Sequence, residues 1–142
     1  MGLKGNFYTG VFKPLYPSKY IGKKKISYRS GLELGFLKYL DSNPKILKWA
    51  YECVVVPYFF DGGWHKYYVD FFVILEDGRR LAIELKPYKE THAPKAGKKN
   101  RKTILYEQFT WAKNSAKWLA AEEFCKKRGI EFKKLTEKDI TI

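Results

Sequence analysis

The sequence predicts an α/β fold in which helices flank a mixed central sheet. Three observations predict it: an early helical pattern, three consecutive strand-like runs, and a helical region followed by one last short strand. Apolar residues spaced three and four apart indicate helices, whereas β-branched and aromatic runs bounded by turn residues indicate strands. This order of elements implies helices packed on a sheet within one domain, for which 142 residues are sufficient.

The chain opens with an irregular arm, which we expect to cover residues 1–27. Glycines, prolines and aromatic residues occur there without a steady period. We expect the arm to pack its aromatic side chains onto the body of the domain. These are Phe7, Tyr8, Phe12 and Tyr16.

The first helix is predicted from Ser30 to Asn43-Pro44, which ends it. Ser30 and Glu33 have the spacing of a capping box, in which the serine hydroxyl accepts from the Glu33 amide and Glu33 bonds back to the serine amide. Glu33 therefore has a structural explanation as well as a catalytic one. Arg29, at the helix entrance, could meet a phosphate or pair with a neighbouring acid.

The next runs predict strands at Cys53 to Phe60, Tyr67 to Leu75 and Leu81 to Leu85, with Pro57 indicating an edge or a bulge in the first. Helical spacing returns from Ile104 to Lys113. Asn114-Ser115 resembles a local N-cap, so we expect a second helix from Ala116 to Arg128, which Gly129 ends. The last strand is predicted from Ile130 to Leu135. Trp111 and Trp118 are expected in the core, with Lys113 and Lys117 on a more polar side.

The second and third strands read as a β-hairpin, and the length of its loop decides which side chains meet. A two-residue loop would place Asp70 and Glu84 on opposite faces. A three-residue loop of Glu76, Asp77 and Gly78, with the glycine in a left-handed conformation, places Asp70 opposite Glu84. We favour this register, because it also pairs Phe71 with Ile83 on the other face.

Opposed carboxylates repel each other unless something compensates, and a divalent metal ion does so well. Lys86 lies two residues beyond Glu84 and points to the same face. A cluster of Asp70, Glu84 and Lys86 suits metal-assisted phosphodiester hydrolysis, in which the lysine orients the attacking water or stabilises developing charge. The alternative is a half-exposed hairpin whose lysine screens two surface acids, because an Asp…Glu-x-Lys match is short and common.

The net charge of +13 predicts a polyanionic partner, and nucleic acid comes first. The basic residues cluster in loop-like stretches, at 19–25 and 95–102, rather than on an amphipathic helix that would suit a membrane surface. We expect phosphate contacts without base readout from the second stretch. Its basic candidates are Lys98, Lys99, Arg101 and Lys102.

Several other classes have little support in the sequence. There is no apolar run long enough for a membrane span and no signal-peptide core, so a cytoplasmic protein is expected. His65 and His92 lack metal-ligand spacing, and no nucleophile elbow or glycine-rich phosphate loop occurs. Cys53 and Cys125 are expected to be small buried hydrophobic residues.

The order helix, three strands, helix and strand, with Glu33, Asp70 and Glu84-x-Lys86, resembles the PD-(D/E)xK nuclease superfamily and its restriction-endonuclease-like αβββαβ core. Val69 stands where the name of the motif places proline. More specifically, the chain from about Tyr20 to Leu135 resembles the head-completion nucleases of myovirus-type tailed phages, and distantly the N-terminal domain of the TnsA endonuclease. The residues that carry the closer resemblance are Tyr28-Arg29-Ser30-x-x-Glu33, Leu40-Asp41-x-Asn43-Pro44, Val56-Pro57-Tyr58, Glu84-x-Lys86-Pro87, Thr110-Trp111, Lys117-Trp118 and Lys127-Arg128-Gly129-Ile130.

The resemblance implies a Mg²⁺-dependent DNA endonuclease, with Mn²⁺ able to substitute, that acts at the packaged DNA end or portal. It implies Glu33, Asp70, Glu84 and Lys86 as catalytic residues, and the Leu85 carbonyl as an extra metal ligand beside the three acids. Portal or neck proteins are implied as partners in the host cytoplasm or the virion, and a homodimer stays open. The alternative is a non-catalytic virion protein that binds DNA ends or the portal; the intact acids and lysine favour the enzyme.

Overall fold

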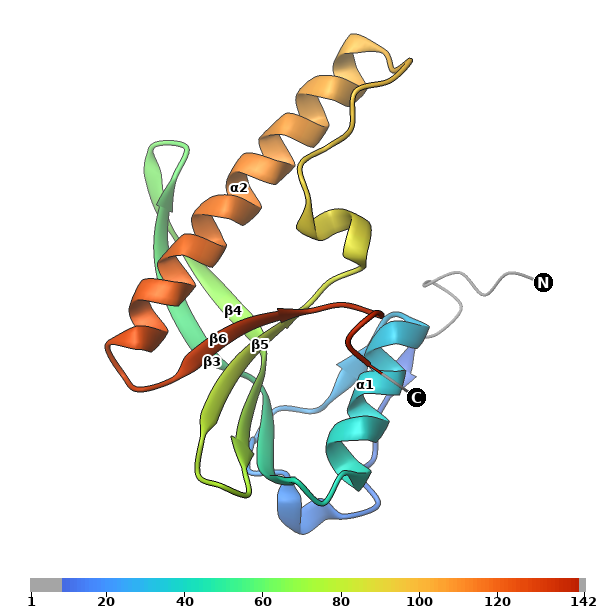
Figure 1. Cartoon of the computed structure of the whole chain (residues 1–142), viewed down its shortest axis with the longest axis vertical. Coiled ribbons are helices and arrows are strands. Elements are labelled where there is room, and N and C mark those ends of the chain that lie inside the picture. Colours follow the sequence, from blue (N-terminus) through green and yellow to red (C-terminus); the bar gives the residue numbers. More distant parts are fainter. Residues whose placement is uncertain (1–8, 141–142) are drawn as a thin grey trace, which may run out of the picture.

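A four-stranded mixed sheet, ordered β3-β4-β5-β6, forms the centre of the protein (Figure 1). The computed structural model describes residues 9–140. The strands β3, β4 and β5 are antiparallel neighbours, and β6 pairs with β5 in parallel. The mixed sheet and the order of its strands along the chain are as predicted. The bounds are β3 (Ile46–Phe60), β4 (Gly63–Leu75), β5 (Arg80–Leu85) and β6 (Glu131–Leu135).

The hairpin of β4 and β5 has the register that the sequence favoured. Phe71 pairs with Ile83 and Val73 with Leu81. The loop between them is Glu76, Asp77 and Gly78, and Gly78 has a φ of 91°, a left-handed conformation that glycine adopts without a side-chain clash. The three-residue loop is therefore confirmed, and it directs the end of β5 toward Asp70.

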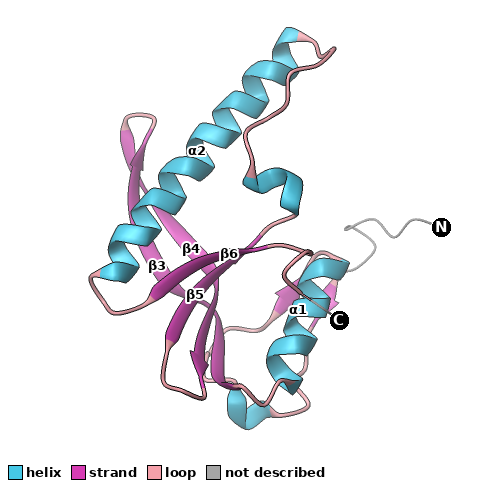
Figure 2. Ribbon diagram, in the orientation of Figure 1, coloured by secondary structure: helices cyan, strands magenta, loops and turns pink. Residues whose placement is uncertain are grey.

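Two helices pack on the sheet, and Figure 2 shows them at different ends of it. Helix α1 (Gly31–Ser42) buries Phe36, Leu37 and Leu40 in an apolar cluster that includes Trp49 and Phe71. Helix α2 (Arg101–Lys126) buries side chains in a second cluster with β3 and β4. Its buried residues are Trp118, Ala121 and Cys125.

The predicted break at Asn114-Ser115 is wrong, because α2 is one continuous helix. Asparagine and serine favour caps, but here both lie inside the helix, and packing overrides that local preference. The rings of Trp111 and Trp118 meet edge to face across this region, with centroids 5.7 Å apart, as two residues seven positions apart on one continuous helix can. The N-cap is instead Asn100, whose side-chain oxygen accepts from the Thr103 amide (2.8 Å).

The arm contains short regular elements rather than an irregular path alone. Strand β1 (Gly10–Val11) pairs with β2 (Ser27–Tyr28), and a 3-10 turn, η2 (Pro17–Lys19), lies between them. Phe12 packs against the α1 cluster as expected, whereas Tyr16 is 55% exposed, so that expectation is wrong. The Tyr16 amide instead donates to the buried Asp41 carboxylate (3.1 Å). Phe7 and Tyr8 fall outside the described residues.

The remaining expectations concern the edge strand β3, the two cysteines and membrane-spanning helices. β3 is an edge strand, as Pro57 indicated, but it begins at Ile46 rather than near Cys53. Cys125 is buried as expected, whereas Cys53 is exposed and that expectation is wrong. Within residues 9–140, no helix is both long and apolar enough to cross a membrane.

Candidate active site

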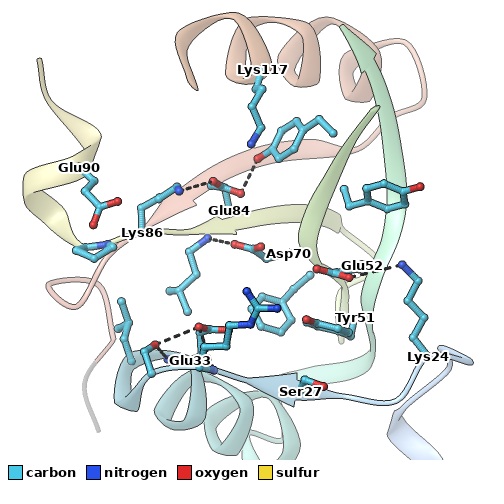
Figure 3. Close-up of a pocket in the computed structure, with 18 of the residues that line it drawn as sticks. Lys24, Ser27, Glu33, Tyr51, Glu52, Asp70, Glu84, Lys86, Glu90 and Lys117 are labelled. Atoms are coloured by element: carbon cyan, nitrogen blue, oxygen red, sulfur yellow. Dashed lines mark hydrogen bonds and ion pairs between the residues drawn. The ribbon is translucent and has the colours of Figure 1, made fainter. Parts of the chain in front are cut away.

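A cavity of about 940 Å³ lies where the middle of β4 and the end of β5 meet the entrance of α1 (Figure 3). Every residue that the sequence nominated for catalysis or metal binding lines it. They come from four places: one from the first turn of α1, one from β4, two from the end of β5, and one just beyond β5. In that order they are Glu33, Asp70, Glu84 with Leu85, and Lys86.

Asp70 and Glu84 form the carboxylate pair of this cavity. Asp70 Oδ2 accepts a hydrogen bond from the Leu85 amide (2.8 Å), where the β4–β5 ladder gives way to a side-chain contact. Burial raises the pKa of Asp70 well above the usual aspartate range, and the neighbouring Glu84 carboxylate raises it further. The Leu85 amide and Lys86 oppose this shift in pKa without cancelling it.

Glu84 is held between two donors. It is 3% exposed, and its Oε1 accepts from the hydroxyl of the buried Tyr67 (2.6 Å), while its Oε2 lies 3.8 Å from Lys86 Nζ. Burial and the Glu84 charge both raise the pKa of Tyr67, so its hydroxyl keeps its proton and donates. Glu84 is thereby fixed in one orientation.

A second lysine reaches the same place from α2. Lys117 Nζ lies over the ring of Tyr67, 4.7 Å from its centroid, and Figure 3 shows the side chain directed toward the carboxylates. Burial lowers the pKa of Lys117, and the charge of Glu84 partly opposes that shift. Two cationic side chains therefore border one carboxylate pair.

Residues 43–137 match the TnsA-like endonuclease N-terminal family. The chain belongs to this family. It is also 40% identical over 137 residues to the head completion nuclease of Enterobacteria phage T4, across 92% of this chain and 91% of that protein. The expected resemblance to TnsA and to head-completion nucleases is confirmed, and the order of elements agrees with a restriction-endonuclease-like fold.

The stretch that matches the TnsA-like family runs from just before β3 to just beyond β6, so it contains Asp70, Glu84 and Lys86 but not Glu33. Glu33 makes a capping box, although with a different partner from the one predicted. Its Oε1 accepts from the Arg29 amide (3.3 Å) and the Ser30 hydroxyl (3.2 Å), not from the serine amide. The same carboxylate faces the cavity, so the structural and catalytic explanations are compatible.

Sequence reasoning missed Tyr67 and Glu52. Alternation along β4 places Tyr67 and Asp70 on opposite faces, so their spacing carried no signal. Glu52 lies at a bulge of β3, between Tyr51 and Val54, with a φ of 50° that non-glycine residues rarely adopt. Its Oε1 lies 3.6 Å from Lys24 Nζ, and both side chains line the cavity of this TnsA-like chain. A bulge reverses the alternation, so this acid could not be placed from the sequence.

Tyr51, beside Glu52, faces the acids as well. Burial and the nearby Glu52 and Glu33 carboxylates raise its pKa to about 12. Asp70 contributes to the same shift. Even so, among residues 9–140 no three His, Cys, Asp or Glu side chains lie close enough together to hold a metal ion on their own. A metal in this cavity would therefore need ligands beyond these side chains.

The predicted DNA-binding residues of the TnsA-like chain divide into two groups. Arg29 and Lys117 line the cavity, whereas those around the start and middle of α2 lie outside it. Arg101 and Lys102 belong to the first turn of α2 and not to a loop, so that part of the basic stretch is more rigid than expected. Lys99 donates to Glu107 (2.8 Å). The residues outside the cavity are Lys98, Lys99, Arg101, Lys102 and Lys113.

Proposed function

We propose that the protein is a metal-dependent DNA endonuclease that hydrolyses phosphodiester bonds. One observation carries the proposal: Asp70, Glu84 and Lys86 converge in a single cavity of a chain that belongs to an endonuclease family. The net charge of +13 supports a polyanionic substrate, because lysine and arginine in excess attract the phosphate backbone.

The side chains of Asp70 and Glu84 and the carbonyl of Leu85 would hold the divalent cation, for which we propose Mg²⁺, with Mn²⁺ able to substitute. These are the hard oxygen donors that such cations take, and Mg²⁺ commonly uses one or two carboxylates with waters and substrate phosphate. The raised pKa of Asp70 beside Glu84 supports this fit, because a bound cation would offset the repulsion between the carboxylates. When bound, the metal neutralises phosphate charge and lowers the pKa of an attacking water.

The other residues of the cavity would bind and orient the reacting groups. Lys86 Nζ, held 3.8 Å from Glu84 Oε2, would orient the water or stabilise negative charge on the phosphate as the bond breaks. Tyr67 would keep Glu84 in place through its hydroxyl. Glu33 would act from α1 as a further acid at the cavity, while its Oε1 remains in the capping box.

DNA would lie across the cavity on cations that contact phosphates rather than base edges. Arg29 and Lys117 border the cavity itself. The basic residues around the start of α2, together with Lys113, would extend this surface. Those around the start of α2 are Lys98, Lys99, Arg101 and Lys102.

The relative from phage T4 is named a head completion nuclease, and we propose the same setting for this chain. The substrate would be the packaged DNA end or the DNA at the portal, and portal or neck proteins would be its partners. The protein would then act in the host cytoplasm or in the virion. A homodimer would allow both strands to be cut.

Plasmid nicking tests the proposal. Supercoiled plasmid is incubated with the protein in Mg²⁺, in Mn²⁺ and in EDTA, and we expect nicked or linear product only with metal. Asp70→Asn and Glu84→Gln should abolish cleavage while keeping the fold, whereas Glu76→Gln, an exposed acid in the same hairpin, should cut like wild type. DNA binding without cleavage under every metal condition would instead support the non-catalytic virion protein.

A further inference from the structure

A second groove, of about 650 Å³, lies between the first half of α2 and the segment that leads to it. This segment begins with a 3-10 turn, η3 (Tyr88–Thr91), and Figure 1 shows it running beside the start of α2, away from the sheet. The groove has no part in the chemistry proposed above. Its walls combine aromatic rings with lysines.

Tyr106 offers the most accessible ring of this groove. It projects from α2, lines the groove and is 71% exposed. The opposite wall carries Tyr88 and His92, whose rings lie 4.5 Å apart. Trp111 closes the groove nearer the sheet, where its ring contacts Trp118. A flat ligand could therefore enter against Tyr106.

Lysines give the groove its charge. Lys89 and Lys95 line it, are exposed, and take part in none of the ion pairs among residues 9–140. Lys99 has a different role, because its ammonium group bonds both to Glu107 of α2 (2.8 Å) and to the Lys95 carbonyl (3.2 Å). This contact ties the segment to the helix, so the groove has a fixed width at that point.

The groove adjoins the cavity that holds the carboxylates. Glu90 lines both, and Figure 3 shows it near Lys86 at the rim of the cavity. An extended chain that leaves the carboxylates past Lys86 would therefore enter the groove directly.

We propose that this groove binds an unpaired length of DNA strand next to the cleavage site, with a base against Tyr106 and phosphates near Lys89 and Lys95. The inference rests on the proposed function and specifies its substrate. Bases in a duplex are stacked on one another, so aromatic walls stabilise binding only when the bases are unpaired. Grooves that join aromatic rings to positive charge are typical of single-strand binding. The preferred substrate would then be a duplex that carries a single-stranded tail.

Fluorescence anisotropy in EDTA, where the DNA stays intact, tests this proposal with two labelled probes. One is a blunt duplex, and the other is the same duplex with a mixed-sequence single-stranded tail. We expect wild type to bind the tailed probe more tightly, and Tyr106→Ala to reduce the ratio of the two affinities by at least about fivefold, given the usual strength of base–aromatic stacking. Tyr106→Phe should keep the ratio, because the ring and not the hydroxyl makes the contact.

Trp64→Ala is the matched control, since Trp64 is 73% exposed and lines neither cavity. It should leave the ratio unchanged. An unchanged ratio in Tyr106→Ala would overturn the inference, as would an equal loss of affinity for both probes, which would mean that the groove holds duplex DNA. If wild type nicks plasmid with metal, either result leaves the proposed function standing. If wild type neither cuts plasmid nor binds either probe, both proposals fail.

Discussion

Replacing Tyr67 by phenylalanine would remove one hydroxyl from the buried end of the candidate active-site cavity. That hydroxyl donates to Glu84 Oε1 at 2.6 Å, and Tyr67 is 2% exposed, so water cannot easily take its place. The ring would remain in its apolar cluster. The change therefore tests the single hydrogen bond that orients the proposed metal ligand.

The expected cost follows from leaving a buried carboxylate oxygen without its donor. Such a loss destabilises a fold by about 1–3 kcal/mol. With 142 residues and an unfolding entropy of about 2.1 cal/mol/K per residue, this lowers the melting temperature by about 3–10 °C. Residues that orient metal ligands also change metal affinity by about 10–100-fold. The half-saturating Mn²⁺ concentration should rise by that factor.

Thermal melts in EDTA and Mn²⁺ titration by calorimetry give the two readouts. Tyr58→Phe is the matched control, because Tyr58 is buried in the same cluster but does not line the cavity. In a Glu84→Gln background, the effect of Tyr67→Phe on melting should be smaller, because the two groups interact directly.

The reasoning would be refuted if Tyr67→Phe melted and bound Mn²⁺ like Tyr58→Phe. A loss of stability without a loss of Mn²⁺ affinity would mean that the hydroxyl supports the fold but does not position a ligand. A loss of affinity that persists fully in the Glu84→Gln background would point to a partner other than Glu84.

Three further predictions concern charge and backbone. Asp70→Asn should raise the melting temperature of the metal-free protein at neutral pH, because burial and Glu84 raise the pKa of Asp70 and so disfavour its ionised form in the folded state. The gain should disappear as the pH falls toward about 4, where Asp70 becomes protonated in the unfolded chain too. The prediction would be contradicted if Asp70→Asn melted below wild type by the same amount at every pH. Replacing the basic residues Lys98, Lys99, Arg101 and Lys102 by glutamine should weaken binding to unrelated duplexes equally. The slope of log affinity against log salt should become shallower, by about 0.9 for each phosphate that the protein no longer neutralises. An unchanged slope would mean that DNA binds elsewhere on the protein. Gly78→Ala should lower the free energy of unfolding by about 1–2 kcal/mol in denaturant titrations, because a side chain at a φ of 91° is strained. Gly97 is the control, because an added side chain there would meet open space, and Gly97→Ala should lower the free energy of unfolding by less than half as much.

The sequence predicted the hairpin that carries the site because the information is local. Glu76, Asp77 and Gly78 determine the loop, the loop determines the register, and the register brings Asp70 to the end of β5. None of these steps depends on a distant part of the chain. The family resemblance then implied a catalytic role for Glu33, whose capping contacts are equally local.

Contacts that depend on packing could not be predicted in the same way. Lys117 reaches Tyr67 only because α2 crosses the sheet at that point, and no spacing in the sequence encodes the meeting. Glu52 faces the cavity because a bulge shifts the register of β3. The continuous α2 also shows tertiary packing overriding the local preference of Asn114 and Ser115 for a cap.

The parallel pairing of β6 with β5 has a consequence for how the protein matures during synthesis. The strand that carries Glu84 gains its second neighbour only after the whole of α2 and β6 have been translated. Until then β5 is an open edge, and the lysine that α2 supplies is missing from the cavity. Pairings between distant segments also form late in folding, because closing the intervening loop costs entropy. A partly translated chain would therefore have its carboxylates but not its finished cleft, and we expect cutting to begin only after β6 has left the ribosome and paired with β5.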